Sequence, residues 1–372
     1  MNIKFFSFII LFVAIAYYSV NAQEKNLNRY KGVNVGSETR TFTSKVNGVS
    51  YKLLINLPAN YQQNKEKQYP VFYVLDGQWA FVNVVSVYGD LHWDGMVPDL
   101  IIVGLTWDGD DPAYGTLRTL DYTPPAPGVP AGSGGADAFI EVLRKEIIPF
   151  VDNEYRTNKK DRAITGTSFG GLFTFYQMFK APELFNGYLP INPALGWANG
   201  KCYDVENEFA QKKTALPVRL CAISGERDAV DNFKKLTDQI ESRGYKGLVM
   251  ENRILEGMGH SGSKAEGHAR GMMFIYDRSP VQLSDAELQQ YTGTYEMGEN
   301  LRFQMVENNG ELLLKIPQNL GMQDLRIFAV GKDDFSIGTH HECKFLRDGQ
   351  GKVVALRVEF PGNQIHEVRK LE

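Results

Sequence analysis

The feature that most constrains the fold is a run ending at Gly171, Arg162-Ala-Ile-Thr-Gly-Thr-Ser-Phe-Gly-Gly. Its apolar residues 163–164 predict a short buried strand, and an apolar helix is expected from near Leu172. Between them lies Gly166-x-Ser168-x-Gly170. That order is what a nucleophile elbow needs, because glycine permits the tight turn and carries no Cβ to collide with the neighbouring strand or helix. The run therefore predicts a serine nucleophile, Ser168, on a strained turn.

Short apolar runs bounded by Gly, Pro or Asp recur along the chain, at residues 71–75, 101–103, 163–164, 218–223 and 248–250. Such runs are typical of strands buried on both faces of a parallel sheet. Helical patterns lie between several of them, at residues 136–151, 172–179 and 231–243. This alternation predicts an α/β fold, a mostly parallel sheet with helices on both faces. Residues 39–57, which alternate around Asn47-Gly48, predict a β-hairpin before it.

The pattern changes after Pro280, where short alternating segments separated by turn residues dominate. The segments are residues 291–296, 301–306, 311–316, 326–330, 344–346 and 352–360. They predict a small all-β, barrel-like domain at the C-terminus. We expect an α/β domain over residues 23–278 and the β domain over residues 279–372.

The N-terminus reads as a secretory signal peptide over residues 1–22. A lysine at position 4 precedes an almost wholly apolar stretch, and small residues stand before the expected cleavage after Ala22. The mature chain is then expected to be periplasmic or secreted. We expect no membrane span after cleavage, because no later segment is long and apolar enough.

Composition excludes several classes of protein. The formal net charge is −4, without a basic face, which argues against a nucleic-acid partner. The chain has three cysteines, Cys202, Cys221 and Cys343, too few for a disulfide framework. A Cys202–Cys221 bridge is conceivable, but a buried free thiol is expected for Cys221. The stability of the fold must therefore come from an apolar core, for which the hydrophobic content of 43% is sufficient.

A serine nucleophile needs a histidine base and an acid that orients it. In α/β-hydrolases the acid follows a strand and lies between the serine and the histidine in the chain. After the strand expected at residues 218–223, the candidates are Glu226, Asp228 and Asp231. Asp228 is favoured because it falls in the loop before the next helix. Asp231 can instead cap that helix, and Glu226 can be solvated.

The expected base is His260, in the glycine-rich run Gly-Met-Gly-His260-Ser-Gly. A histidine on such a loop can reach a serine on a neighbouring loop. The competing His268 falls within a helical stretch.

The reaction also needs donors for the oxyanion. One is expected to be the backbone N–H of Phe169, directly after the serine. The other should come from the loop after the strand at residues 71–75, where Gly77 lets the backbone turn its amides inward. Gln78 or Trp79 is the expected donor there.

Two segments around the elbow carry a family resemblance: Phe139-Ile-Glu-Val-Leu-Arg-Lys-Glu-Ile-Ile-Pro149, continuing to Tyr155, and Asn192-Pro-Ala-Leu-Gly-Trp197. With the elbow, they resemble the esterase D or "putative esterase" family of α/β-hydrolases over about residues 40–275. That family includes S-formylglutathione hydrolases, feruloyl esterases, siderophore esterases and mycolyltransferases. Members often have Ser-Pro where this chain has Asn-Pro.

The resemblance implies an α/β-hydrolase fold with Ser168, Asp228 and His260 as the triad. The segment Arg118-Thr-Leu-Asp-Tyr-Thr-Pro124 is similar to a loop of the siderophore-esterase branch. The C-terminal part resembles small β domains appended to secreted serine hydrolases.

These features predict a secreted serine carboxylic-ester hydrolase that acts through an acyl-enzyme and needs no metal or organic cofactor. The expected substrate is a small-molecule or glycan-linked ester, with Trp79, Trp197 and Arg118 as substrate-binding candidates. Two alternatives stay open: a periplasmic esterase of catecholate siderophore trilactones, and a degenerate hydrolase that binds carbohydrate. The acyl acceptor is water or a sugar hydroxyl, because an acyl-enzyme can react with either.

Overall fold

The computed structural model describes residues 37–59, 61–277, 280–298, 301–321, 323–337, 341–360 and 364–371. The chain divides into two compact units. One contains Val35–Leu91 and Asp99–Tyr276, and the other contains Asp277–Glu372 with the short segment His92–Pro98. The predicted signal peptide, residues 1–22, lies outside the described residues, as do residues 278–279 at the predicted domain boundary.

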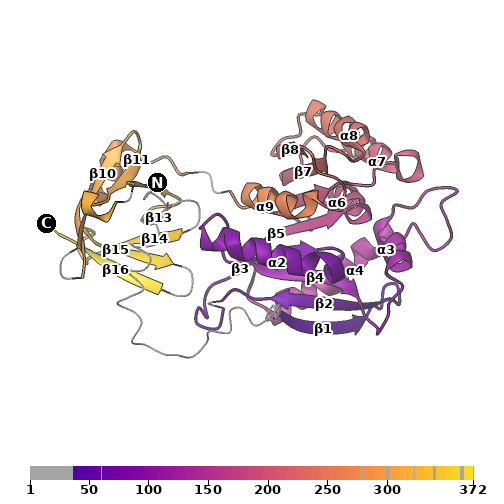
Figure 1. The fold of residues 1–372 in the computed structure, drawn as a ribbon, viewed down its shortest axis with the longest axis horizontal. Helices are drawn as coiled ribbons and strands as arrows, with labels where there is room; N and C mark the ends of the chain where they lie inside the picture. The colour runs from indigo at the N-terminus through magenta and orange to yellow at the C-terminus, as the bar shows by residue number, and fades with distance from the viewer. Residues whose placement is uncertain are drawn as a thin grey trace, which may run out of the picture. The chain divides into compact units, whose positions relative to one another are not determined.

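The first unit is built on an eight-stranded sheet in the order β1-β2-β4-β3-β5-β6-β7-β8 (Figure 1). The strands are β1 (Ser37–Thr43), β2 (Ser50–Asn56), β3 (Tyr69–Val74), β4 (Ile101–Trp107), β5 (Thr157–Thr167), β6 (Gly187–Ile191), β7 (Arg219–Gly225) and β8 (Val249–Leu255). Strands β1, β2 and β4 pair antiparallel, and all pairs from β4 to β8 are parallel. The carboxyl ends of β3 and β5 to β8 therefore lie along one edge.

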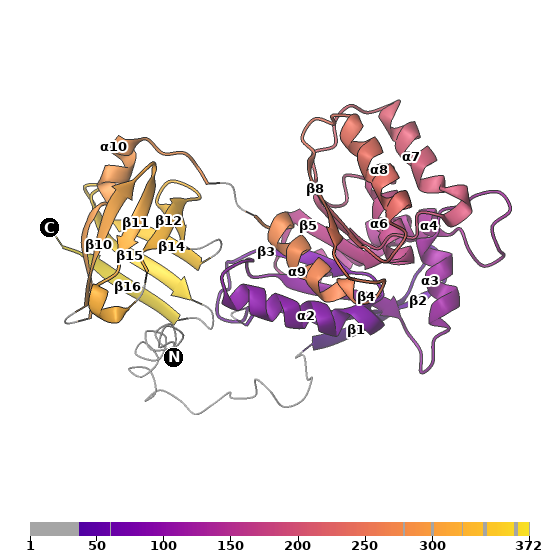
Figure 2. The same ribbon diagram turned by 45° about the horizontal axis from the view of Figure 1, so that its top comes forward.

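Helices cover both faces of this sheet. They are α2 (Gly77–Trp93), α3 (Tyr114–Tyr122), α4 (Ala136–Val142), α5 (Ile148–Glu154), α6 (Phe169–Lys180), α7 (Lys201–Ala210), α8 (Val230–Ser242) and α9 (Ser263–Ile275). Figure 2 shows α2 and α9 together on one side. Phe81 of α2 packs so tightly on β4 that a Cβ at Gly104 would lie 2.7 Å from its ring. The other face carries a large core in which Phe139 and Phe173 pack against each other, with ring centroids 5.1 Å apart.

The predicted α/β fold class and the hairpin are confirmed. The hairpin pairs Thr43 with Ser50, and Gly48 in its turn has φ 75°. Two segments expected as loops are helical instead. Residues 77–79 open α2, whose side chains are apolar on most sides and so hide the helical period. Residues 118–122 belong to α3.

The C-terminal unit is a closed eight-stranded antiparallel barrel, which confirms the barrel-like prediction. Its strands are β9 (Gly293–Met297), β10 (Leu301–Asn308), β11 (Glu311–Lys315), β12 (Leu325–Ala329), β13 (Asp334–Ile337), β14 (His341–Arg347), β15 (Val353–Phe360) and β16 (Gln364–Lys370). The barrel closes because β9 pairs with both β10 and β16. The sequence did not predict β13 or β16, which are short or rich in polar residues.

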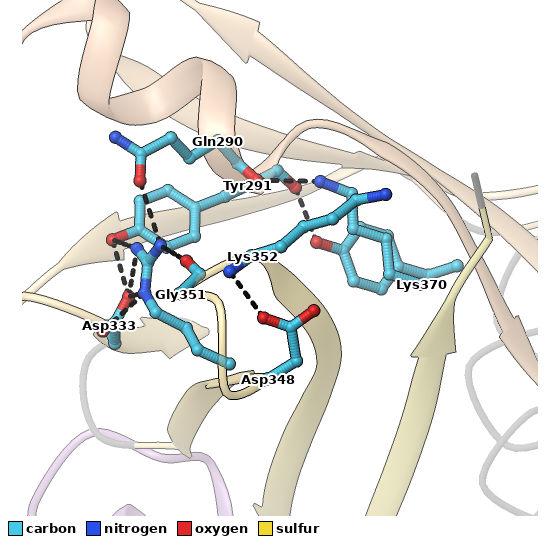
Figure 3. Close-up of polar contacts among 9 residues, drawn as sticks. Gln290, Tyr291, Asp333, Asp348, Gly351, Lys352 and Lys370 are labelled. Atoms are coloured by element: carbon cyan, nitrogen blue, oxygen red, sulfur yellow. Dashed lines mark hydrogen bonds and ion pairs between the residues drawn. The ribbon is translucent and has the colours of Figure 1, made fainter.

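A network of polar side chains centred on Arg347 ties the barrel to the short helix before it. The guanidinium donates to the Asp333 carboxylate at 2.7–3.0 Å, to the Tyr291 hydroxyl at 3.1 Å and to the Gly351 carbonyl at 2.7 Å. Figure 3 shows Tyr291, Asp333 and Gly351 close together, with Gln290 beside them. The Arg347 and Asp333 side chains are each only 20% exposed.

We predict that Arg347→Met destabilises the barrel by about 2 kcal/mol, because Asp333 and the Gly351 carbonyl lose a charged donor at a half-buried site. Hydrogen exchange of the barrel amides, followed by mass spectrometry, should accelerate. The matched control is Arg302→Met, which removes an exposed ion pair with Glu296 from the same barrel. Equal protection in the two variants would contradict this role for the Arg347 network.

Candidate active site

Ser168 lies on the turn between β5 and α6, with φ 62° and ψ −117°. A Cβ at Gly166 would lie 2.5 Å from the carbonyl carbon of Gly170, and one at Gly171 would lie 2.8 Å from the Ile191 carbonyl oxygen. At Gly170 the nearest atom would be 3.4 Å away, an ordinary contact. The steric requirement for glycine therefore falls on positions 166 and 171, and not on position 170 as the pattern suggested.

The turn borders an open pocket of about 140 Å³. Residues from four parts of the sheet edge line it, and they include Trp79, Arg118, Ser168, His260 and Lys264. The structure thus brings the predicted nucleophile and the predicted base to one cavity.

His260 pairs with Asp228, whose Oδ2 lies 2.6 Å from the Nδ1 of the imidazole. The two other acids lie elsewhere. Glu226 accepts the backbone N–H of Gly257 at 2.7 Å, and Asp231 lies in the first turn of α8. The Asp228 side chain is 19% exposed and that of His260 is 49% exposed. When Nδ1 donates to the carboxylate, Nε2 is left as the proton acceptor.

The predicted oxyanion donors lie at two helix N-termini. Phe169 is the first residue of α6, and Gly77 and Gln78 are the first residues of α2. Backbone N–H groups in a first helical turn have no carbonyl within the helix to bond. The Trp79 N–H is different, because it donates to the Asp76 carbonyl at 2.9 Å. Gly77 and Gln78 thus remain the donor candidates on this side.

Two of the three predicted substrate-binding residues, Trp79 and Arg118, line the pocket, and Trp197 lies beside Phe169. Trp79 lines the pocket and is 56% exposed. Arg118 also lines it, with its guanidinium 5.6 Å from the Trp79 ring and 5.5 Å from the Phe169 ring. Trp197 packs edge-on against Phe169 at 5.5 Å, and its indole N–H donates to the Pro124 carbonyl at 3.0 Å. Trp197 therefore packs against the Phe169 side chain and holds it in place.

Sequence reasoning assigned no role to Asn192, which follows β6. Its amide donates to the His260 carbonyl at 2.7 Å and accepts the Gly225 N–H at 2.7 Å, and it also contacts the Ser263 hydroxyl. The side chain thereby ties the histidine loop to the end of β7. Its position could not be foreseen, because β6 contains Gly187 and Pro190 and was not predicted as a strand.

Asp76 was also not singled out. It follows β3, has φ 54° and is 5% exposed. Arg118 donates to both of its carboxylate oxygens, at 3.0 and 2.8 Å. An aspartate directly after a buried strand and before a glycine is the sequence feature by which it could have been found.

Comparison with known proteins identifies relatives of the first unit. Residues 44–247 match the model of the "Putative esterase" family. The chain is 26% identical over 247 residues to the ferri-bacillibactin esterase BesA of Bacillus subtilis, covering 60% of this chain and 84% of the relative. It is 27% identical over 256 residues to an endo-1,4-beta-xylanase/feruloyl esterase of Xylanibacter ruminicola, covering 64% of this chain and 32% of the relative.

Solved structures share the fold. An IroE-like serine hydrolase from Shewanella oneidensis superposes with a TM-score of 0.59 at 22% identity, covering 68% of this chain and 84% of that one. The siderophore hydrolase EstA from Aspergillus nidulans also gives 0.59, at 18% identity, and covers 68% of this chain and 99% of that one.

The contacts of Asn192 lead to a stability prediction. Asn192→Ala leaves the Gly225 N–H and the His260 carbonyl without this partner, which should cost about 2–3 kcal/mol of unfolding free energy. Urea denaturation measures the loss. The control is Asn252→Ala, which removes one exposed hydrogen bond to Glu241. If both variants unfold at the same urea concentration, Asn192 does not hold the histidine loop.

Proposed function

The chain belongs to the "Putative esterase" family of carboxylic ester hydrolases, and on that premise we propose that it is a serine esterase. Ser168 is the nucleophile, His260 the base and Asp228 the orienting acid. The observation that carries this proposal is the 2.6 Å pair of His260 and Asp228 beside a pocket that Ser168 also lines on its strained turn.

In the first half of the reaction, His260 Nε2 takes the proton of the Ser168 hydroxyl as its oxygen attacks the ester carbonyl. The carbonyl oxygen gains the charge, and the N–H groups of Phe169 and of Gly77 or Gln78 stabilise it. The carbon–oxygen bond to the alcohol then breaks, and His260 returns the proton to the departing alcohol. In the second half water repeats these steps and releases the acid.

The pocket favours a substrate of which only the reacting end is enclosed. A cavity of about 140 Å³ is small beside the sites that bury a whole drug-sized ligand, which are about 300–1,000 Å³. The rest of a larger ester would extend over the exposed Trp79 and the neighbouring Arg118. An aromatic acyl group can stack on Trp79.

Siderophore esters are the substrate class that we propose to test first. The support comes from BesA, a ferri-bacillibactin esterase, and from a siderophore triacetylfusarinine C esterase of Aspergillus fumigatus, which is 26% identical over 163 residues. That relative is covered over 54% of its length. Feruloyl esters are the next class, because one relative is a feruloyl esterase.

A carbohydrate-binding role without catalysis has less support. It would be favoured by a row of exposed aromatic side chains on the barrel. Among the described side chains of the barrel strands, the large apolar one that is exposed is aliphatic, Ile365. The chain also carries a serine, an aspartate and a histidine in the chain order of a triad.

We further propose that residues 1–22 are a signal peptide and that the esterase domain, residues 23–278, acts in the periplasm or outside the cell with the β domain, residues 279–372. No helix in the described part of the chain is both long and apolar enough for a membrane crossing.

The first prediction from this proposal concerns the nucleophile. Ser168→Ala should reduce the hydrolysis of p-nitrophenyl butyrate by at least about 10⁴-fold, because the substitution removes the oxygen that would form the acyl-enzyme. The control is Ser261→Ala, beside His260 on an exposed loop, which should stay active. Undiminished release of p-nitrophenol by the Ser168 variant would refute the serine mechanism.

The second prediction separates the candidate acids. Asp228→Asn should lower kcat by about 10³–10⁴-fold, because an amide does not hold the imidazole in the tautomer that accepts the serine proton. Glu226→Gln retains an oxygen for the Gly257 N–H and should change kcat little. Steady-state kinetics on the same ester decides between them, and the reverse ranking would assign the role to Glu226.

A further inference from the structure

Arg118 and Asp76 form an ion pair that joins two separate parts of the candidate site. Arg118 lies on α3, and Asp76 precedes the first turn of α2, where the donors Gly77 and Gln78 begin. Nε donates to Oδ1 at 3.0 Å and Nη2 to Oδ2 at 2.8 Å. The side chains are 17% and 7% exposed, so this planar, two-bond contact is largely shielded from water.

The same pair also reaches the nucleophile turn. Nη2 of Arg118 donates to the carbonyl of Thr167, the residue before Ser168, at a longer 3.4 Å. The guanidinium lies over the ring of Phe169, 5.5 Å from its centroid. On the other side, Oδ2 of Asp76 lies 3.4 Å from where a Cβ of Gly170 would be. The pair thus contacts residues on both sides of Ser168.

Helix α3 is held firmly, which fixes the position of Arg118. The Tyr122 hydroxyl accepts the backbone N–H of Asp76 at 3.2 Å. Asp121 accepts the Trp107 indole N–H at 2.7 Å and the Tyr51 hydroxyl at 2.9 Å. The side chains of Tyr122, Asp121, Trp107 and Tyr51 are each at most 2% exposed. The end of α3 is therefore part of the rigid core. From there Arg118 can hold both the turn at Asp76 and the turn at Ser168 in place.

We propose that Arg118 is a positioning residue that sets the distance between the two backbone donors of the oxyanion site. It holds Asp76, and with it the N–H groups of Gly77 and Gln78, against the turn that presents the N–H of Phe169. The inference rests on the proposed esterase function. It differs from the sequence expectation of a substrate contact, because two of the three guanidinium nitrogens are directed at Asp76.

The test compares kcat with KM for p-nitrophenyl butyrate, a neutral ester. Arg118→Ala should lower kcat by about 10–100-fold, somewhat less than the loss of a whole oxyanion donor, with KM changed by less than about threefold. The inhibition constant of a short-chain trifluoromethyl ketone, whose adduct with serine carries an oxyanion, should rise by the same factor as kcat/KM falls. Guanidinium chloride at about 50 mM should restore part of kcat, where potassium chloride at equal concentration does not.

The partner residue gives a second readout. Asp76→Asn should lower kcat to a similar degree, and the double variant should be little worse than either single variant, because the two residues act as one unit. The matched control is Arg243→Ala, which removes a guanidinium that binds both oxygens of the buried Glu206 at 3.1 and 3.0 Å in the same unit. It should lower the melting temperature and leave kcat intact.

Two results would overturn the inference. In one, Arg118→Ala keeps kcat and ketone affinity and raises KM only for anionic esters, which would make Arg118 a substrate contact. In the other, Arg118→Ala and Arg243→Ala lose activity alike in proportion to their melting temperatures. Either result leaves the proposed function standing, provided that the wild-type protein is active and Ser168→Ala is not. An active Ser168→Ala variant would instead remove the premise.

Discussion

The candidate site depends on the backbone of Ser168, which is held at a positive φ that a side-chain-bearing residue rarely adopts. Such a conformation persists only where its surroundings over-determine it. Here the Ser168 N–H donates to the Ile191 carbonyl at 3.1 Å, and its carbonyl accepts the N–H groups of Leu172 at 2.9 Å and Ala194 at 3.0 Å. Strand β6, helix α6 and the loop after β6 therefore hold the turn together. The absence of a Cβ at Gly166 and Gly171 is what lets these elements approach so closely.

Buried polar side chains fix the loops around this turn. Asn192 binds the histidine loop, and Asp76 binds α3 through Arg118. Both residues follow parallel strands and both have positive φ angles, 44° and 54°. A hydrogen bond to a buried group fixes direction as well as distance, whereas apolar contacts tolerate sliding. This arrangement suits a site in which donors on separate loops must converge on one oxygen.

The elements with the strongest local patterns were predictable from the sequence. The elbow, the hairpin and the buried strands β3, β4 and β7 each follow from residue type and spacing over a few positions. The choice of Asp228 and His260 follows from the chain order of the strands, and their catalytic roles stay a prediction. The features that the sequence did not predict depend on tertiary context. Helix α2 carries β-branched residues such as Val84 and Val85, and it buries only the face that includes Phe81 and Val84. Asn192 looks like an ordinary loop residue until β6 places it between β7 and the histidine loop.

The interior of the barrel is an apolar core. The rings of Tyr291, Phe335 and Phe345 pack with centroids 4.6–4.9 Å apart, and aliphatic side chains from neighbouring strands complete the core. An eight-stranded barrel is only just wide enough for side chains to fill its interior. In the described strands aromatic and aliphatic side chains occupy this interior, whereas a pocket of about 490 Å³ at β13 to β15 is lined in part by charged side chains, among them Asp334, Lys344 and Arg357.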